Sequence, residues 1–274
     1  MSKTIVSTAV AGVLLALGSH AAIAAPDWGK VPKRDVHVFH PGVTPIEWAT
    51  KKADHSGTAG MKKGESCAGC HEEKGSLNFN FKRLADKELE PKGAPKTMTF
   101  PVTVQAAYDA ANLYIRLTFK APTGGADKGD KDNEVKATLL FADAKVPQAD
   151  QFGCWQSCHA DARTMPGADE KKSKYVAAGA YELVQWASKG NKVSDGSVTT
   201  ERKMSGGTAG AKAEASKAGD TYTVTFTRKN PGEGKSVPFG LAIHADNSHG
   251  RFHHVSLGYK LGIGADGDVK AVKQ

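Results

Sequence analysis

Long apolar runs and cysteines are both scarce in this 274-residue sequence. The one extended apolar run, at residues 9–17, is well short of the roughly 20 residues that a membrane-spanning helix needs. We therefore expect no membrane span. The four cysteines fall in two short segments, which confines any thiol-dependent chemistry to those segments.

The N-terminus has the pattern of a secretory signal peptide. Lys3 precedes the apolar run, and Ala22-Ile23-Ala24 follows it as an Ala-x-Ala cleavage site. Cleavage near Ala24 would remove residues 1–24 and lower the formal net charge from +8 to +7, because that segment contains one lysine. The mature chain, beginning near Ala25, is long enough for one sizeable domain and a smaller extension.

The first cysteine pair lies in Cys67-Ala68-Gly69-Cys70-His71. Two thiols three positions apart, followed at once by a histidine, are typical of covalent c-type haem attachment. Each thiol would add to a porphyrin vinyl group as a thioether, and His71 would bind the iron as proximal ligand. On a helical turn the two thiols lie about 60° apart, on one face.

The second pair lies in Cys154-Trp155-Gln156-Ser157-Cys158-His159, with three residues between the thiols instead of two. Thiols at i and i+4 still share a helix face, so this segment predicts a second haem with His159 as proximal ligand. Two alternatives stay open for the four cysteines: two disulfides, or one zinc site. Covalent haem in an exported chain indicates the periplasm.

A six-coordinate haem needs a second, distal ligand, usually His or Met. For the first haem we expect His55, sixteen residues before His71, because the chain between them can loop over the porphyrin. His40 is the next candidate, with His37 behind it and Met61 weaker.

From residue 99 the apolar pattern takes the period of two that is typical of β-strands. We expect short helices around the haem motifs and at residues 45–53, a partly helical interruption of the β chain from the second haem motif through residues 175–186, and a loose loop with a ragged strand at 189–219. The predicted strands lie at residues 99–106, 113–119, 135–141, 221–228, 239–244 and 252–263. We place a domain boundary after residue 95, with an N-terminal haem segment at 25–95 and a β domain at 96–274.

The last predicted strand contains the candidate distal ligand of the second haem. Alternation puts His253 on the apolar face with Val255, whereas His254 takes the opposite face and is the backup candidate. Met165, only six residues past His159, is weaker still. His244 faces away from the apolar side of its own strand, so we expect a structural or exposed role for it.

Residues 99–264 resemble the haem-binding domain of the ethylbenzene dehydrogenase γ-subunit family, the b-haem subunits of type II molybdenum enzymes of the dimethyl sulfoxide reductase class. The resemblance rests on Tyr108-Asp109 ahead of Leu113-Tyr114-Ile115-Arg116-Leu117, and on His253-His254-Val255-Ser256. It implies a mainly β fold, an antiparallel β-sandwich, here with an N-terminal haem-carrying extension.

The sequence also departs from that family, whose single haem is non-covalent and held between a methionine and a lysine. The second cysteine segment stands where the methionine would fall, His253 stands about where the lysine would, and residues 30–90 are an addition. The chain therefore looks like a diheme c-type branch of the family, found as periplasmic electron-transfer cytochromes.

Lysines dominate the charge, and Lys62 and Lys63 lie close to the first motif. A basic rim there would steer acidic redox partners, although an ordinary solvated lysine face has the same composition. Export argues against nucleic acid as a partner.

We therefore predict a periplasmic diheme cytochrome c that transfers electrons between redox partners of a respiratory chain, with both haems bis-His ligated and no enzymatic activity. Two alternatives stay open. One is a haem enzyme with an open coordination position, a peroxidase or an oxyanion or nitrogen-oxide reductase, which carbon monoxide binding would reveal. The other is an electron-transfer subunit of a molybdenum enzyme.

Overall fold

The computed structural model describes residues 25–42, 44–50, 55–73, 75–81, 97–122, 134–159, 175–176, 178–245 and 253–274. The side chains of Trp48, Cys158 and His159 are not among the described parts. The predicted signal peptide and Met165 lie outside the described residues. Among the described residues, no helix is long and apolar enough to cross a membrane.

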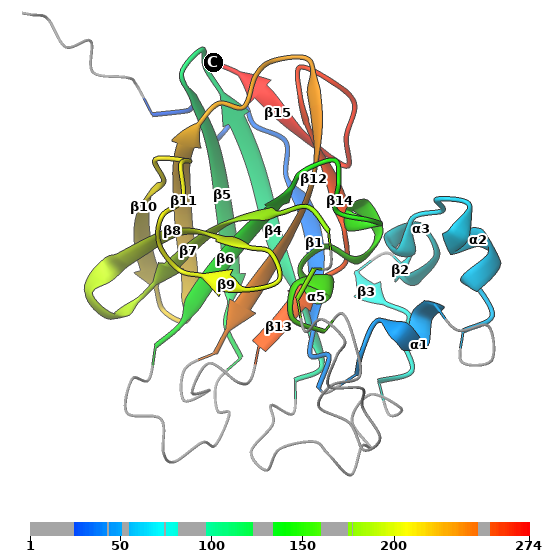
Figure 1. Cartoon of the computed structure of the whole chain (residues 1–274). Helices are drawn as coiled ribbons and strands as arrows, with labels where there is room; N and C mark the ends of the chain where they lie inside the picture. The colour runs from blue at the N-terminus through cyan, green and yellow to red at the C-terminus, as the bar shows by residue number, and fades with distance from the viewer. Residues whose placement is uncertain are drawn as a thin grey trace, which may run out of the picture.

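The helices are short and the strands numerous, as Figure 1 shows. The helices are α1 (Glu47–Thr50), α2 (Thr58–Lys62), α3 (Cys67–His71) and α5 (Ala149–His159), with a 3-10 turn η1 (Lys189–Asn191). The strands are β1 (Arg34–Phe39), β2 (Glu72–Glu73), β3 (Ser76–Leu77), β4 (Thr99–Tyr108), β5 (Asn112–Lys120), β6 (Lys136–Ala142), β7 (Tyr181–Ala187), β8 (Lys192–Val198), β9 (Arg202–Lys203), β10 (Lys212–Ala218), β11 (Thr221–Lys229), β12 (Lys235–His244), β13 (His253–Ser256), β14 (Tyr259–Ile263) and β15 (Val269–Lys273).

Thirteen strands form one large sheet in the order β10-β11-β5-β4-β1-β13-β12-β6-β7-β8-β9, while β14 and β15 make a second link between β12 and β4. The strand pairs in this sheet are antiparallel except for β14 with β15 and β15 with β4. Since β1 with β13 and β14 with β15 both connect β4 to β12, the middle of the sheet closes on itself. The predicted mainly β, antiparallel architecture is confirmed.

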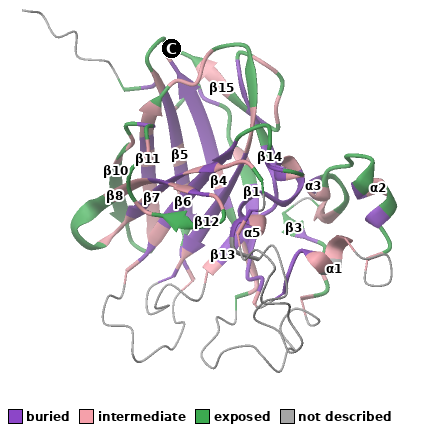
Figure 2. Cartoon of the chain, viewed as in Figure 1, coloured by how far each residue is buried: buried purple, intermediate pink, exposed green. Residues whose placement is uncertain are grey.

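The two halves of the sheet pack face to face as the layers of a sandwich. The rings of Tyr222 in β11 and Trp186 in β7 lie 6.1 Å apart between centroids. Arg228 in β11 reaches the opposite half, where it pairs with Glu182 at 2.6 Å and lies 5.0 Å from the ring of Phe141. Alternate residues of the strands fill the space between the layers, and Figure 2 shows this buried interior.

The N-terminal segment contributes to the sandwich before it leaves it. Strand β1 lies between β4 and β13, and its Val36 and Val38 are fully buried. The chain then forms α1, α2, α3 and the small β2–β3 hairpin, which lie together at one side of the sandwich (Figure 1). The predicted division after residue 95 stays a prediction, but the N-terminal segment contributes strand β1 to the sheet of the β domain.

Three local predictions are wrong. The predicted interruption is helical at α5, but residues 181–187 form β7, and the segment predicted as a loose loop with a ragged strand at 189–219 contains three strands, β8, β9 and β10. The single strand predicted at 252–263 is interrupted between β13 and β14 at residues 257–258. At the break the backbone contacts α5 instead of a strand: the Gly258 N–H donates to the carbonyl oxygen of Gln151 at 2.9 Å, and a Cβ on Gly258 would lie 2.4 Å from the carbonyl oxygen of Ala149.

Candidate haem-binding sites

The first cysteine motif forms α3, a single helical turn. Ser66 caps its N-terminus, because the Ser66 Oγ accepts a hydrogen bond from the backbone N–H of Gly69 at 3.2 Å. The Cys67 side chain is half-buried and Cys70 is exposed, and neither is in a disulfide. Burial raises the pKa of the Cys67 thiol to about 12, with smaller contributions from the neighbouring Cys70 and from Asp150.

The structure brings His55 and His71 together beside these thiols. Their rings lie 5.8 Å apart between centroids, at an interplanar angle of 30°. Both histidines line a pocket of about 230 Å³ together with Cys67 and Cys70. The predicted distal ligand, the predicted proximal ligand and the two thiols predicted to form thioethers therefore meet in one cavity.

Hydrogen bonds set the tautomer of both rings. The Nδ1 of His71 lies 3.0 Å from the carbonyl oxygen of Asn78, and the Nδ1 of His55 lies 3.0 Å from that of Ala49. A carbonyl oxygen can only accept, so each Nδ1 carries the proton and each Nε2 keeps its lone pair. Metal-binding histidines commonly use this arrangement.

The distance between the two ring centroids is close to the distance that a metal ion between two imidazoles requires. Two metal–nitrogen bonds of about 2 Å, together with the ring radii, place the centroids roughly 6 Å apart. The 5.8 Å between His55 and His71 agrees with that geometry. Of the weaker candidates Met61 also lines this pocket, whereas His37 and His40 do not.

Glu72, directly after His71, ties the first site to the sandwich. Its carboxylate accepts hydrogen bonds from Arg34, from the Tyr259 hydroxyl at 3.4 Å and from the Nδ1 of His37 at 3.3 Å. Burial raises the pKa of Tyr259, and the Glu72 charge adds to the effect. His37 therefore holds this carboxylate instead of facing the first pocket.

The second cysteine motif lies on α5, which packs closely on the strands through glycine. Gly153 has a φ of 50° and lies against the backbone of Leu257, where an added Cβ would be 2.4 Å from the carbonyl oxygen. A Cβ on Gly240 would lie 2.3 Å from the backbone nitrogen of Cys154. These contacts press Cys154 into the sandwich, where it is 4% exposed.

The second pocket, of about 50 Å³, contains Cys154 and His253, together with His244, Arg202 and Met204. His244 and His253 are cross-strand partners in β12 and β13, and their ring centroids lie 5.1 Å apart. Burial lowers the pKa of His244 well below its usual value, and repulsion from the positive charge of a protonated His253 lowers it further. Two of the four residues predicted to hold the second haem, Cys154 and His253, line this pocket, but the described residues form a cavity smaller than the 300–1,000 Å³ typical of ligand sites.

His254 faces the other side of the sheet. Its Nε2 lies 2.7 Å from the carbonyl oxygen of Thr97, and its ring packs against His40 and Phe100 at centroid distances of 5.7 and 4.9 Å. Burial lowers the pKa of His254 to about 3, despite the hydrogen bond to Thr97. Of the two adjacent histidines, only His253 lies in the second pocket.

Sequence reasoning missed His244 as a pocket residue. We expected a structural or exposed side chain, because His244 faces away from the apolar residues of its strand. A signal was present in Gly240 and Ala242, which lie on the same face as His244 and are too small to fill the space above the strand.

Comparison with known proteins assigns the family. Residues 25–271 match the profile of the family described as "Ethylbenzene dehydrogenase". The chain belongs to this family. The resemblance predicted from Tyr108-Asp109 and the C-terminal His253-His254 pair is confirmed.

Two similar proteins are named as cytochromes. "Cytochrome c-552" of Stutzerimonas stutzeri is 48% identical over 293 aligned positions and covers 100% of both chains. "Cytochrome c-551" of Rhodocyclus tenuis is 49% identical over 254 positions, which cover 91% of this chain and 100% of that one. Among solved structures, a carbohydrate binding module family 9 from Caldicellulosiruptor kristjanssonii is 12% identical with a TM-score of 0.34, over 57% of this chain and 65% of that one.

The two sites of this family member are in contact through aromatic side chains. Phe79 lies 4.7 Å from the His71 ring and 4.9 Å from Phe39, and Phe39 lies 5.4 Å from Trp155, the residue after Cys154. The Trp155 indole also donates to the carbonyl oxygen of Thr44 at 3.1 Å. Rings therefore connect the two cysteine motifs.

Proposed function

We propose that this protein is a periplasmic diheme cytochrome c that carries electrons between redox partners. The cytochromes c among its relatives support the electron-carrier assignment. The observation that carries the proposal is the adjacent pair of His55 and His71, each with its Nδ1 bonded to a carbonyl oxygen, beside Cys67 and Cys70.

In the first site, Cys67 and Cys70 would hold the porphyrin as thioethers, and the Nε2 atoms of His55 and His71 would bind the iron. A bound haem c takes up and releases one electron at a time. Because both rings are held by backbone carbonyls, the side chains need little rearrangement when the charge of the site changes. Two imidazole ligands would also leave no position for a substrate and keep the potential fairly low.

In the second site, Cys154 and Cys158 would form the thioethers, His159 would be the proximal ligand and His253 the distal one. The pocket that His253 shares with Cys154 supports this assignment over His254, which donates to Thr97 on the other face.

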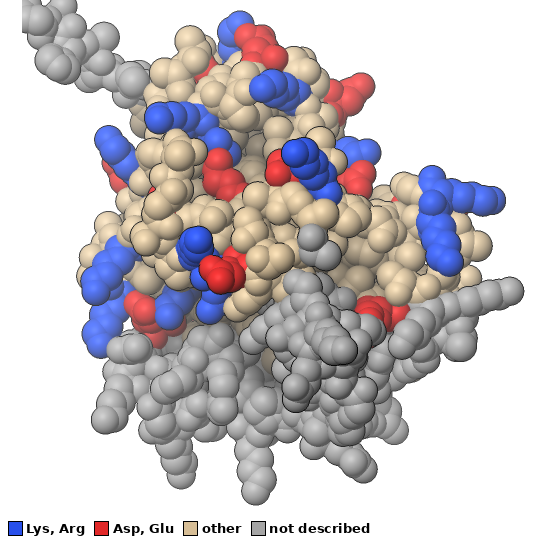
Figure 3. Space-filling view, viewed as in Figure 1, with Lys and Arg blue, Asp and Glu red and all other residues tan. Residues whose placement is uncertain are grey.

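Partner recognition would use the exposed lysines near the first site. Lys62 and Lys63 project from the end of α2, where Figure 3 shows positive side chains on the outermost part of the extension. Such charge would attract an acidic partner toward the exposed Cys70 edge and speed association at low salt. The family description also keeps a dehydrogenase subunit as an alternative, which co-purification of a molybdenum enzyme from the periplasm would favour.

The first test is the intact mass and reduced absorption spectrum of the mature protein, made in a host that attaches haem to cytochromes. We expect the mass of the chain from Ala25 plus two haems, and no carbon monoxide binding. Replacement of Cys67 and Cys70 by serine should remove one haem. Carbon monoxide binding by the unmodified protein would instead favour a haem enzyme.

A ligand variant tests the assignment of His55. We expect H55A to keep both haems but to open one of them to carbon monoxide. M61L is the matched control, because Met61 lines the same pocket and should leave the site closed. Carbon monoxide binding by M61L, but not by H55A, would transfer the distal role to Met61.

A further inference from the structure

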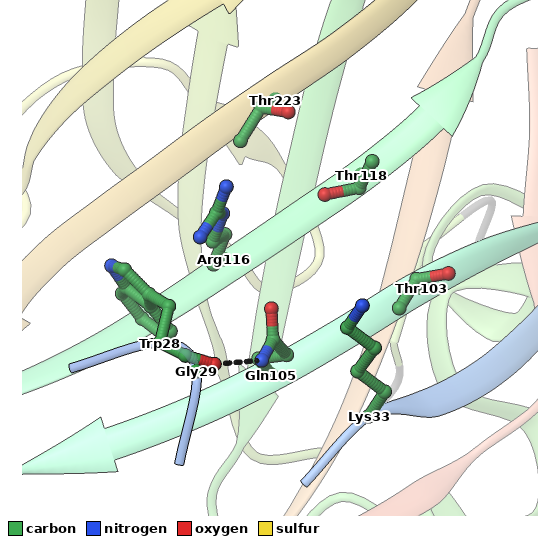
Figure 4. Close-up of a pocket in the computed structure, with 8 residues that line it drawn as sticks. All are labelled: Trp28, Gly29, Lys33, Thr103, Gln105, Arg116, Thr118 and Thr223. Atoms are coloured by element: carbon green, nitrogen blue, oxygen red, sulfur yellow. Dashed lines mark hydrogen bonds between the residues drawn. The ribbon is translucent and has the colours of Figure 1, made fainter. Parts of the chain in front are cut away.

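A further pocket, remote from both cysteine motifs, lies on the outer face of the sheet. Its volume is about 430 Å³, within the range of small-molecule sites, and Figure 4 shows the residues around it. Its floor is formed by β4, β5 and β11, and the segment that contains Trp28 and Lys33 forms its wall.

Strand register collects polar side chains on this floor. Thr103, Thr118 and Thr223 are cross-strand neighbours, and Gln105 is the cross-strand partner of Arg116 in the next row. Alternation points these side chains away from the buried core. The patch is therefore continuous across three strands.

Gln105 holds the wall against the floor. Its Nε2 donates to the carbonyl oxygens of Trp28 at 2.9 Å and of Val31 at 2.8 Å, and its side chain is buried. These bonds leave the amide oxygen directed into the pocket, as Figure 4 shows. The cavity is thus built by specific hydrogen bonds.

Arg116 is half-buried, and its Nε lacks a hydrogen-bond partner within the described part of the chain. Its guanidinium carbon lies 5.5 Å from the centroid of the Trp28 ring, and its Nε is buried with no hydrogen-bond acceptor. Among the described residues, neither Arg116 nor Lys33 forms an ion pair. The nearby carboxylate of Asp35 lies at the margin and accepts the Thr103 hydroxyl at 2.6 Å.

Arg228 provides an internal comparison, because it also lies over an aromatic ring of the sandwich. Arg228 is paired with Glu182 at 2.6 Å. At Arg116 the aromatic contact is present and the carboxylate is missing. An unsatisfied buried donor is unfavourable, and a guanidinium bonds best to the oxygens of a carboxylate or phosphate.

We propose that this pocket binds a small oxyanion through Arg116 and Lys33, with the hydroxyls of Thr118 and Thr223 as additional donors. The Lys33 ammonium lies over the floor near Thr103 (Figure 4), so the two cations approach the cavity from different sides. Carboxylate and phosphate groups share the required chemistry. The site is independent of the proposed haem function.

Isothermal titration of the mature, haem-loaded protein tests this proposal, with acetate and inorganic phosphate as separate probes at constant ionic strength. We expect saturable binding of at least one anion, and the two titrations identify which. Glucose, which is uncharged but hydroxylated, should not bind. Binding of neither anion up to 10 mM, a limit of roughly −3 kcal/mol in affinity, would overturn the proposal.

Variants distinguish the pocket from general attraction to a basic protein. We expect R116Q to weaken binding about tenfold or more and K33Q by a smaller factor, because each removes a charge-assisted donor. The matched control is K217Q, since Lys217 lies over the Tyr222 ring at 4.9 Å but outside this pocket. Equal weakening by all three variants, or none by K33Q and R116Q, would overturn the proposal. Lys33 is exposed, so K33Q should fold even if R116Q does not.

Discussion

Replacing Glu72 should loosen the attachment of the first haem-binding segment to the sandwich. Glu72 follows His71 directly, and its carboxylate is bonded to Arg34, His37 and Tyr259 from β1 and β14. E72Q keeps the size of the side chain but removes the charge, and E72A removes the acceptor altogether. We expect E72A to be the more destabilising change.

The expected loss of stability depends on how deeply Glu72 and its partners are buried. The side chains of Glu72 and His37 are 9% and 5% exposed, whereas Arg34 is 41% exposed, so solvent screens the Arg34 pair. A hydrogen bond to a charged group contributes about 1.5–3 kcal/mol when buried, and less when screened. We therefore expect E72A to lower the free energy of unfolding by about 2–3 kcal/mol and E72Q by about 1–2 kcal/mol.

Guanidinium denaturation followed by far-ultraviolet circular dichroism measures the effect on the whole protein, and amide hydrogen exchange at residues 55–73 measures it locally. The control is E73Q, because Glu73 is exposed and accepts only a surface bond from the Asn78 amide at 2.8 Å. We expect E73Q to lower the free energy of unfolding by less than about 0.5 kcal/mol. Equal stability of E72A and the unmodified protein, or an equal loss in E73Q, would refute the argument.

Three further predictions concern other parts of the molecule. Burial opposes ionisation of Asp109, but hydrogen bonds from a tyrosine hydroxyl and two backbone N–H groups outweigh it and lower the pKa of this carboxyl from 3.8. The stabilisation by ionised Asp109 is therefore present above pH 3.8 and is lost as the pH falls below that value. We expect D109N to lower the free energy of unfolding by about 1 kcal/mol in urea at pH 7, and we expect this difference to shrink at pH 3. Burial raises the pKa of Glu182, although the positive charge of Arg228 opposes this shift. We therefore expect E182Q to be destabilising by only about 1 kcal/mol and R228M, which leaves the buried carboxylate unpaired, by about 3 kcal/mol. A larger loss in E182Q than in R228M would contradict this reasoning. H253A should open the second haem to carbon monoxide while H254A leaves it closed, and carbon monoxide binding by H254A alone would reverse the assignment.

Local signals in the sequence were sufficient for much of the fold and for the first site. Strands β5 and β11 alternate apolar and polar residues along their whole length, and the Cys67–His71 segment is a continuous motif. The meeting of His55 with His71 was also predictable, because a loop of sixteen residues can return to the other side of a flat ring. In each case the relevant residues are close in sequence.

Strand β10 illustrates where such signals fail. It lies at the outer edge of the sheet, and nearly all of its residues are exposed. Its conformation depends on backbone pairing with β11 rather than on burial of an apolar face. A segment rich in lysine, alanine and serine therefore forms a regular strand without an alternating apolar pattern.

The partners of Glu72 could not be predicted from the sequence, for a different reason. Arg34, His37 and Tyr259 are 38, 35 and 187 residues away in the sequence. Nothing in an isolated Glu72-Glu73 pair distinguishes the residue that points into the sandwich from the one that faces water. That choice is made by the hairpin of β2 and β3, which places Glu72 toward β1 and β14.

The same long-range packing couples the two cysteine motifs. Helix α5 is pressed onto the strands by Gly153 and Gly240, and from that position the Gln151 amide donates to the carbonyl oxygens of Met61 and Glu65 at 2.8 and 2.6 Å. Met61 lies in α2 and Glu65 lies between α2 and α3, so both carbonyls belong to the segment that leads to Cys67. The sandwich therefore sets the relative position of the motifs through backbone contacts and hydrogen bonds that involve no haem, so the protein can preorganise both sites around one rigid scaffold.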